Sequence, residues 1–357
     1  MSNYEQFIGT RAVAPQHAFD EASLARWLRA HVEGFAGDLL VEQFKGGQSN
    51  PTFLLSAGAR RYVMRRKPAG QLLPSAHAVD REFRVISALA GTDVPVAKAY
   101  ALCEDTGVIG TMFYVMDYVE GRVIWDPALP GLTNEQRRAH YAELGRVIAA
   151  LHKVDYDAVG LGDYGKPGNY IERQVARWTK QYRAAETEKI EAVERLIEWL
   201  PARIPPGDET AIVHGDYRFD NVIFHPSEPR ILAVLDWELS TLGHPLVDFA
   251  YHCMTWRMQA AEGSRGLGGV DLASLGIPSE EEYRAAYLRA TARTQAVSEE
   301  DWTFYLVFNM FRLVGILQGI MARAIQGNAS NAQALQAGRR ARPLAEQAWA
   351  LAQQLNP

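Results

Sequence analysis

The sequence predicts an α+β protein whose strands gather in the first part of the chain and whose remainder is mainly helical. Three short runs rich in alternating apolar residues lie at 39–44, 52–56 and 61–65, a pattern typical of strands. A chain of 357 residues is long enough for one large core or for two lobes. Helical spacing of apolar residues predicts helices over 20–32, 77–90, 134–153, 170–185, 189–200, 245–258, 279–294, 299–325 and 332–355.

The composition argues against several classes of partner. A formal net charge of −5 gives no basic field for nucleic acid, so we expect no nucleic-acid partner. The N-terminus has neither a basic start nor an apolar stretch, and the apolar segment 302–321 contains polar side chains, which favours a buried helix over a membrane span. Cys103 and Cys253 have no partner motif, so we expect buried, reduced thiols in a cytoplasmic protein.

The stretch His214-Gly-Asp-Tyr-Arg-Phe-Asp-Asn221 is the most informative part of the chain, because Asp216 precedes Asn221 by five residues. Kinases use this spacing in their catalytic loop. There the aspartate accepts the proton of an attacking hydroxyl, and the asparagine binds a magnesium ion on the ATP phosphates. We therefore predict that Asp216 is the catalytic residue and that Asn221 binds metal.

Short buried strands are expected on both sides of this loop, over 211–214 and 222–224. A third, over 231–235, places Asp236 at its end, where the second metal-binding carboxylate of a kinase is expected. Taken singly, each of these residues is equally typical of a structural polar group at a loop. The three together at kinase spacing favour a kinase site.

This motif, followed by Leu235-Asp-Trp-Glu-Leu-Ser240 and Gly243-His-Pro-Leu-Val-Asp248, resembles the aminoglycoside phosphotransferase and choline kinase superfamily of small-molecule kinases. Within it, the chain looks most like the kinase domain related to the one fused to certain acyl-CoA dehydrogenases. The resemblance extends from about Leu39 onward and is strong only in the catalytic segment.

The resemblance implies a two-lobed protein-kinase-like fold, with a small antiparallel-sheet N-lobe and a larger, mainly helical C-lobe. It also implies ATP and Mg²⁺ as cofactors and a small hydroxyl-bearing molecule as substrate. We expect residues 1–120 to form an N-terminal helix plus the nucleotide-binding small lobe, and residues 121–357 to form the catalytic and substrate-binding lobe.

A glycine-containing turn joins the first two strands, where a kinase keeps its phosphate-covering loop. Gly46 and Gly47 let the backbone approach a phosphate, and the side chains of Gln48, Ser49 and Asn50 can donate hydrogen bonds. The segment lacks the Gly-x-Gly-x-x-Gly pattern of protein kinases, so a plain hairpin turn remains the alternative.

Arg65 ends the third strand, where kinases place the lysine that contacts the α- and β-phosphates. An arginine there keeps the charge and can fork across two phosphate oxygens. Arg66 and Lys67 are rival candidates, although strand alternation puts Arg66 on the opposite face. A solvated charge at a strand end is the structural alternative.

Glu82 lies beside the buried stripe of the helix over 77–90, within reach of Arg65. The corresponding ion pair of kinases holds the phosphate-contacting cation in place. A surface ion pair with Arg81 or Arg84 is the alternative.

The strand expected over 108–116 leads into the segment that corresponds to a kinase hinge. The backbone around Met116, Tyr118 and Val119 is expected to contact the adenine ring. For Met116, plain core packing is the alternative. We also expect His214 to support the catalytic loop and Asp248 to anchor it, with direct metal contact by Asp248 as the less favoured role.

The expected substrate helices bear on the identity of the phosphate acceptor. Aromatic and basic residues on the expected substrate helices favour a metabolite with an acyl or anionic group, plausibly a hydroxyacyl-CoA. An aminoglycoside-type antibiotic kinase and a nucleotide-binding pseudokinase remain alternatives, and the arginines can instead pair with nearby carboxylates. The favoured set is Trp256, Arg257, Arg284, Arg289, Trp302, Arg312 and Arg323, and the carboxylates are Glu280, Glu281, Glu282 and Asp301.

Overall fold

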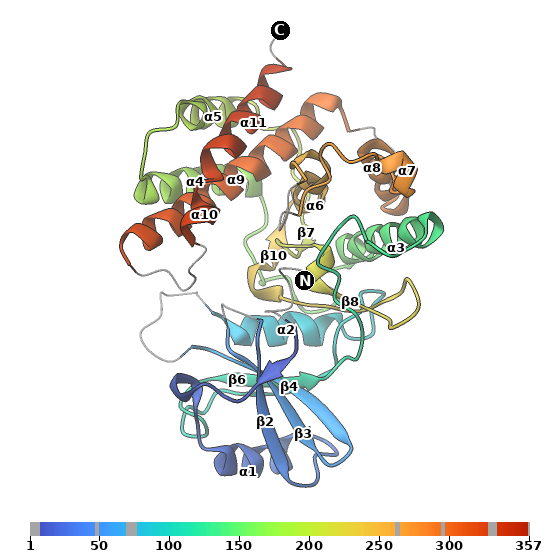
Figure 1. Cartoon of the computed structure of the whole chain (residues 1–357), viewed down its shortest axis with the longest axis vertical. Coiled ribbons are helices and arrows are strands. Elements are labelled where there is room, and N and C mark those ends of the chain that lie inside the picture. Colours follow the sequence, from blue (N-terminus) through green and yellow to red (C-terminus); the bar gives the residue numbers. More distant parts are fainter. Residues whose placement is uncertain are drawn as a thin grey trace.

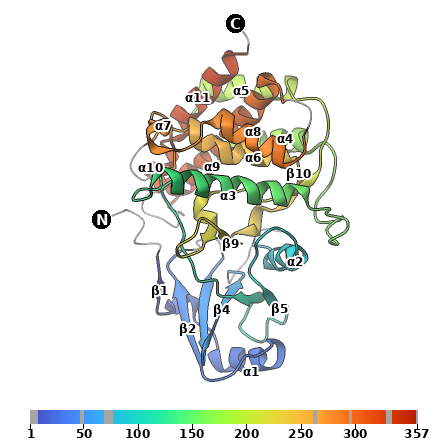
Figure 2. The same ribbon diagram turned by 90° about the vertical axis from the view of Figure 1, so that its right-hand side faces the viewer.

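A computed structural model of the chain describes residues 8–46, 50–68, 77–260, 265–293, 297–327 and 334–355. The protein has two lobes, with an antiparallel sheet at one end and an assembly of helices at the other (Figure 1). The perpendicular view in Figure 2 shows the same division. The predicted α+β class, with strands first and helices after, is confirmed.

The sheet has six strands in the order β1-β2-β3-β4-β6-β5, and all neighbours are antiparallel. Burial alternates along β3, as expected for a strand with one face against a core. The strands are β1 (Thr10–Arg11), β2 (Leu39–Phe44), β3 (Thr52–Ala57), β4 (Arg60–Arg66), β5 (Ala99–Cys103) and β6 (Phe113–Asp117).

The strand expected over 108–116 is wrong in its first half, because β6 begins only at Phe113. The residues before it form a turn in which the Gly110 N–H donates to the Thr106 carbonyl at 2.8 Å. Gly110 has a φ of 88°, which glycine adopts without strain and which ends an extended run. The edge strand β5 was not predicted from the sequence.

Helices α1 (Glu21–His31) and α2 (Val79–Leu89) pack against different parts of the sheet. α1 buries Leu24 and Leu28 in a cluster with Phe53. α2 buries its apolar side chains in the core that continues into the helical lobe. Figures 1 and 2 both show α2 between the sheet and the helices, with α1 at the far end. α2 is therefore placed to carry side chains to the junction of the lobes.

The helical lobe is built around α9, whose side chains are mostly buried. α9 is long and apolar enough to cross a membrane by length and composition, but 72% of its most apolar window is buried inside the fold. It acts here as a core helix. The helices of this lobe are α3 (Asn134–Lys153), α4 (Tyr170–Ala185), α5 (Glu191–Ala202), α6 (Pro245–Arg257), α7 (Leu272–Leu275), α8 (Glu280–Ala290), α9 (Glu299–Ile325), α10 (Ala334–Gly338) and α11 (Ala341–Gln353).

The single helix expected over 332–355 is wrong, since its described part forms two helices, α10 and α11. Pro343 lies in the first turn of α11, where a helix tolerates a residue without an N–H. At Gly338, which ends α10, an added Cβ would come within 2.6 Å of the Cβ of Met321. The break therefore follows from a proline and from close packing on α9.

Two short antiparallel strand pairs hold the segment between His214 and Asp236, and the inner pair, a hairpin, lies within the chain that connects the outer pair. β7 (Ala211–Val213) pairs with β10 (Thr241–Gly243), and β8 (Val222–Phe224) pairs with β9 (Ile231–Val234). The Leu235 N–H donates to the Asn221 carbonyl at 2.8 Å, so Asn221 and Asp236 lie at the same end of the β8–β9 hairpin. Strand β10 was not predicted from the sequence.

Candidate active site

Asp216 lies in the loop between β7 and β8, and three side chains donate to its carboxylate. The Tyr251 hydroxyl donates to Oδ1 at 2.6 Å. Arg218 Nη2 and Asn221 Nδ2 each donate to Oδ2 at 2.9 Å. Asn221 Nδ2 also donates to the Asp216 carbonyl oxygen at 2.8 Å. The carboxylate is thus fixed in orientation while its side chain stays 17% exposed.

Two residues support this loop from distant helices: Tyr251, which sequence reasoning missed, and Arg312, which was expected to bind the acceptor but is buried beneath the loop. Tyr251 comes from α6, and Arg312 comes from α9 and donates to the Gly215 carbonyl at 2.8 Å. The Arg312 guanidinium also lies over the Tyr251 ring, 5.0 Å from its centroid. Only Tyr251 carried a signal, since it follows Asp248 by three residues and so lies about one helical turn along.

Asp248 anchors the loop that carries Asp216 from inside the helical lobe. The backbone N–H groups of His214 and Gly215 donate to its carboxylate at 2.8 and 2.7 Å, and His152 Nε2 lies 3.1 Å away. We call these four residues the anchor cluster. Burial alone would raise the pKa of Asp248, but the hydrogen bond with His152, the electrostatic effect of the His152 and His214 rings and the His214 N–H hold it below its usual value.

The backbone and the ring of His214 complete the anchor. His214 Nε2 donates to the Leu235 carbonyl at 2.8 Å, and the Asp216 N–H donates to Nδ1 at 3.2 Å. The ring therefore ties the end of β9 to the catalytic loop. Gly215 has a φ of 83°, and an added Cβ would come within 3.0 Å of Leu239, so this turn requires glycine.

Asp236 follows β9 in the left-handed conformation, with a φ of 61° and a ψ of 61°, which is uncommon for a residue other than glycine. Its Oδ1 accepts a hydrogen bond from Arg65 Nη2 at 2.7 Å. The same nitrogen lies 3.7 Å from Glu238 Oε2, and Arg65 Nε lies 3.1 Å from Glu82 Oε2. We call Arg65, Glu82, Asp236 and Glu238 the interlobe cluster, because the first two come from the sheet lobe and the others from the connection between β9 and β10.

The charge of Arg65 is maintained by its neighbours. Burial alone would lower the pKa of Arg65, but Glu82 and Asp236 outweigh that effect and raise it. The rival cations have other partners: Arg66 is buried and donates to the His17 carbonyl at 3.0 Å, and Lys67 lies 3.2 Å from Asp80. Strand alternation turns Arg66 to the opposite face of the sheet, and Lys67 lies beyond β4 beside Asp80, so only Arg65 of the three contacts Asp236.

Glu82 is 1% exposed and accepts hydrogen bonds from the Asn50 amide at 2.8 Å and the Tyr114 hydroxyl at 3.1 Å. The alternative partners for Glu82 are engaged elsewhere. Arg81 donates to the Tyr164 carbonyl, and Arg84 pairs with Asp163. The structure therefore places Glu82 beside Arg65.

The proposed phosphate loop is only partly described. Gly46 lies two residues after the end of β2, whereas Gly47, Gln48 and Ser49 lie outside the described residues. Asn50 is buried, and its carbonyl oxygen Oδ1 lies 3.0 Å from His77 Nδ1. Because its amide N–H also faces Glu82, the Asn50 side chain links the loop to α2.

The expected adenine-contacting segment continues from β6 toward the helical lobe. Met116 is buried in the core and faces Val63 and Ala99 across the sheet. The Tyr118 N–H donates to the Arg61 carbonyl at 3.3 Å. Val119 is partly buried against the same core. The sequence left core packing open as the alternative role of Met116, and the structure shows that packing.

Several residues favoured for acceptor binding are occupied inside the helical lobe. Arg257 pairs with Glu280, and Arg284 pairs with Glu299. Trp302 is 1% exposed, and its indole N–H donates to Glu280 at 2.7 Å. The alternative of pairing with the named carboxylates therefore holds for Arg257, whereas Arg284 pairs with a carboxylate outside that set, Glu299.

The arrangement fits a magnesium ion that is shared with phosphate oxygens. Among the described residues, no group of three His, Cys, Asp or Glu side chains is placed to hold a metal ion. Mg²⁺ often takes only one or two protein carboxylates and completes its shell with phosphates and water. Asn221 and Asp236 offer hard oxygen donors at one end of the β8–β9 hairpin, which suits this mode.

Comparison with known families and relatives connects the site to phosphotransferases. The model of the "Phosphotransferase enzyme family" matches residues 40–303. Acyl-CoA dehydrogenase family member 10 from Mus musculus is 45% identical over 342 residues, which is 95% of this chain and 32% of that protein. The chain spans between 32% and 45% of the length of such curated relatives.

Solved structures show the same fold. A Ralstonia eutropha protein provisionally described as an aminoglycoside phosphotransferase has a TM-score of 0.87 and 59% identity, covering 94% of this chain and 99% of that one. Aminoglycoside phosphotransferase APH(4)-Ia, solved with AMP-PNP and hygromycin B, has a TM-score of 0.59 and 15% identity over 92% and 98% of the chains. The latter likeness concerns the fold alone. The predicted resemblance and the protein-kinase-like fold are confirmed.

Proposed function

The chain belongs to the phosphotransferase enzyme family, and we propose that it transfers the γ-phosphoryl group of ATP to a hydroxyl of a small metabolite. One observation carries the proposal. Asn221 donates to Asp216, Asp236 lies at the same end of the β8–β9 hairpin as Asn221, and Arg65 reaches Asp236 from the sheet lobe. A pseudokinase would need no proton acceptor beside its metal-binding residues, so the retained Asp216 supports catalysis.

In this proposal Asp216 orients the acceptor hydroxyl and accepts its proton during direct, in-line transfer. Tyr251 and Arg218 hold the carboxylate in place through the hydrogen bonds described above. Phosphoryl transfer passes through a loose transition state that depends more on positioning than on a strong base. No covalent intermediate on the protein is required.

Asn221 and Asp236 would hold Mg²⁺, which neutralises the charge that builds on the phosphates. Arg65, held by Glu82, would contact the non-transferred phosphates with its planar donors. The AMP-PNP bound by APH(4)-Ia, a protein of the same fold, supports ATP as the donor. The remaining residues proposed to contact the nucleotide are Gly46, Gly47, Gln48, Ser49, Asn50, Met116, Tyr118 and Val119.

For the acceptor we propose a small metabolite that carries an acyl or anionic group, plausibly a hydroxyacyl-CoA. The relation to proteins named as acyl-CoA dehydrogenase family members supports this choice. An aminoglycoside-type acceptor is the alternative, suggested by the description of the Ralstonia eutropha protein.

The variant Asp216→Asn tests the proposed function. The substitution keeps the shape of the side chain but removes the charge that receives the proton. We expect phosphoryl transfer to fall on the order of 10²-fold or more, with folding and ADP binding nearly unchanged. Activity is measured as ATP-dependent phosphorylation across a panel of hydroxylated metabolites, with Asp38→Asn, an exposed site in the sheet lobe, as the matched control. Transfer at the parental rate by Asp216→Asn would remove Asp216 from the catalytic role.

A further inference from the structure

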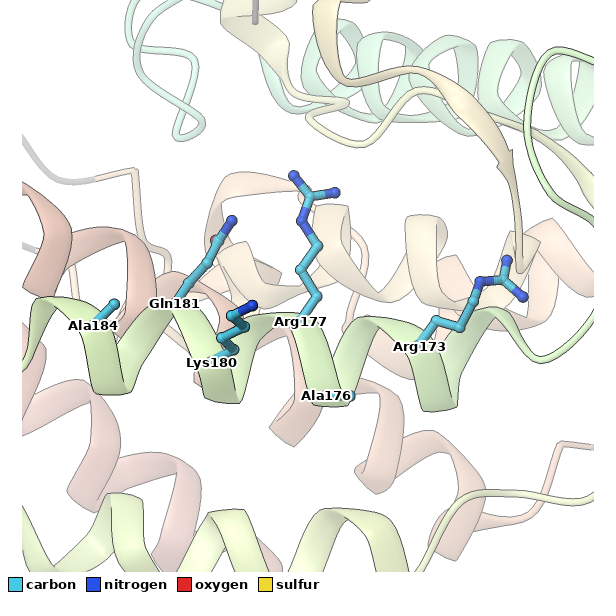
Figure 3. Close-up of a pocket in the computed structure, with 6 residues that line it drawn as sticks. All are labelled: Arg173, Ala176, Arg177, Lys180, Gln181 and Ala184. Carbon is cyan, nitrogen blue, oxygen red and sulfur yellow. The ribbon is translucent and has the colours of Figure 1, made fainter. Parts of the chain in front are cut away.

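The outward face of α4 carries a group of positive charges above a shallow hollow. The hollow measures about 610 Å³, and its lining residues all come from one face of this helix: Arg173, Ala176, Arg177, Lys180, Gln181 and Ala184. Figure 3 shows Arg173, Arg177 and Gln181 extending from the same side of the helix. A second hollow, of about 420 Å³, shares Arg173 and Ala176 with the first and adds Lys166 and one acid, Glu172.

These charges gather on one helical face without carboxylate partners among the described residues. In the part of the chain that the structure describes, we find no ion pair for Arg173, Arg177 or Lys180. Arg173 donates only to the Lys166 backbone carbonyl, at 2.5 Å. By contrast, Arg183, which lies near the end of the same helix, pairs with Glu194. In a protein of net charge −5, three unpaired cations on one helical face attract anions.

Contacts through the helical lobe connect this face to Asp216. Trp178, next to Arg177, lies under the Arg312 guanidinium, 5.5 Å from ring centroid to Cζ. Arg312 in turn lies over Tyr251, which donates to Asp216. Three side chains in contact, Trp178, Arg312 and Tyr251, therefore connect the α4 helix to Asp216.

Electrostatics at Tyr170 agree with this placement. Burial raises the pKa of Tyr170, and the charges of Arg312, Arg177 and Arg173 oppose that rise. Tyr170 also packs against Gly243 at the end of β10, where an added Cβ would lie 2.8 Å from its ring. The positive charges of α4 thus act on residues that border the catalytic hairpins.

We propose that Arg173, Arg177 and Lys180 on α4 bind the phosphate-bearing end of the acceptor while its hydroxyl lies at Asp216. The inference rests on the proposed function and gives its acceptor a definite anion-binding surface. The α4 surface takes the acceptor-binding role that the sequence had suggested for Arg257 and Arg284, since both of these are paired within the helical lobe.

The spacing of the charges selects the kind of anion. Seven residues of α-helix separate Arg173 from Lys180, a rise of about 10 Å. A single carboxylate would reach one of these cations, whereas a tail with several phosphates can contact two or three. Arginine binds phosphate through paired N–H donors and lysine as a point charge. A polycationic acceptor would be repelled by the same face, so the surface disfavours aminoglycosides.

Binding of coenzyme A and of pantetheine to the full chain, measured calorimetrically with Mg-ADP present, tests the assignment. Pantetheine retains the thiol end of coenzyme A but lacks its phosphates. We expect Arg177→Ala and Lys180→Ala each to weaken coenzyme A binding about tenfold, and the double variant about 50- to 100-fold. The weak binding of pantetheine should not change. Arg138→Ala on α3, an exposed arginine for which no ion pair is described, is the matched control and should leave both affinities unchanged.

Each outcome decides the assignment. Coenzyme A affinity lost in the double variant supports it. Equal affinity in the parent and the double variant, or no binding of coenzyme A to the parent, overturns it. Binding of polyglutamate in place of coenzyme A would make the face a protein-docking surface and also overturn it. Phosphotransfer absent from every protein, with coenzyme A binding still dependent on Arg177 and Lys180, would instead count against the proposed function alone.

Discussion

The anchor cluster and the interlobe cluster hold the two ends of the segment from His214 to Asp236 and differ in burial and in origin. In the anchor cluster the Asp248 side chain is 2% exposed, and its partners all belong to the helical lobe. In the interlobe cluster the Asp236 side chain is 34% exposed, and Arg65 reaches it from the sheet lobe. One cluster therefore fixes the loop within a single lobe, while the other connects two lobes.

The two clusters differ in how firmly their partners hold the charged groups. Two backbone N–H groups and a histidine contact the Asp248 carboxylate. Because the carboxylate is buried, it needs these hydrogen-bond partners and is held in one orientation. Arg65 instead contacts three carboxylates through a long side chain with several rotatable bonds. We infer that these ion pairs rearrange when phosphates and a metal ion enter, since the entering charges compete for the same groups. The anchor should be essential for stability, and the interlobe cluster for nucleotide binding.

The largest expected effect is on the anchor. Asp248→Ala leaves the N–H groups of His214 and Gly215 buried without an acceptor, so we expect the free energy of unfolding to fall by about 3–5 kcal/mol. Urea denaturation followed by circular dichroism measures it. In the comparison variant Asp236→Ala, Arg65 keeps Glu82 as a partner, so we expect a loss of about 1 kcal/mol or less. Equal losses in the two variants would abolish the contrast between the clusters.

A second effect concerns pH, because α6 carries His252 beneath the catalytic loop. Burial lowers the pKa of His252 to about 4, so the folded protein keeps this ring neutral while the unfolded chain, with a pKa near 6.5, binds a proton. The contribution of His252 to stability is therefore complete above about pH 6.5 and is lost as the pH falls toward 4, by about 3 kcal/mol in all.

Urea denaturation at a series of pH values measures this loss. In His252→Gln, which cannot titrate, the unfolding free energy should depend less steeply on pH between 6.5 and 4. His31→Gln, at an exposed position on α1, is the control. An unchanged slope in His252→Gln would show that acid sensitivity arises elsewhere.

Local patterns in the sequence predicted much of the fold and the polar residues of the catalytic segment. The predicted bounds of α3, α4, α9 and β8 agree with the structure, because each has strong apolar periodicity or lies in the motif. Side-chain partners were harder to predict, since they depend on how distant elements pack. Arg257 and Glu280 are 23 residues apart in the sequence, and Tyr251 reaches Asp216 across 35 residues.

The same reason explains why the anchor cluster was only partly predicted. Asp248 was expected to anchor the loop, but His152 on α3 is 96 residues away in the sequence, and no spacing rule connects them. The interlobe cluster was easier, because strand alternation and helix periodicity independently direct Arg65 and Glu82 to one side of the sheet. Short elements such as β5 and β10 carry too little pattern to predict.

The smallest expected effect tests whether Arg65 serves the nucleotide more than the fold. Arg65→Ala should weaken ATP about 30-fold, since charge-assisted bonds to phosphate are lost, but leave adenosine nearly unchanged because it has no phosphates. Calorimetric titration with both ligands measures the difference. Arg65→Lys keeps a cation on β4 and should retain most of the ATP affinity, and Lys67→Ala, at the rival position, should bind like the parent. Similar losses for ATP and adenosine in Arg65→Ala would mean that Arg65 acts by holding the lobes together, as the anchor cluster holds the loop, and the distinction between the two clusters would then fail.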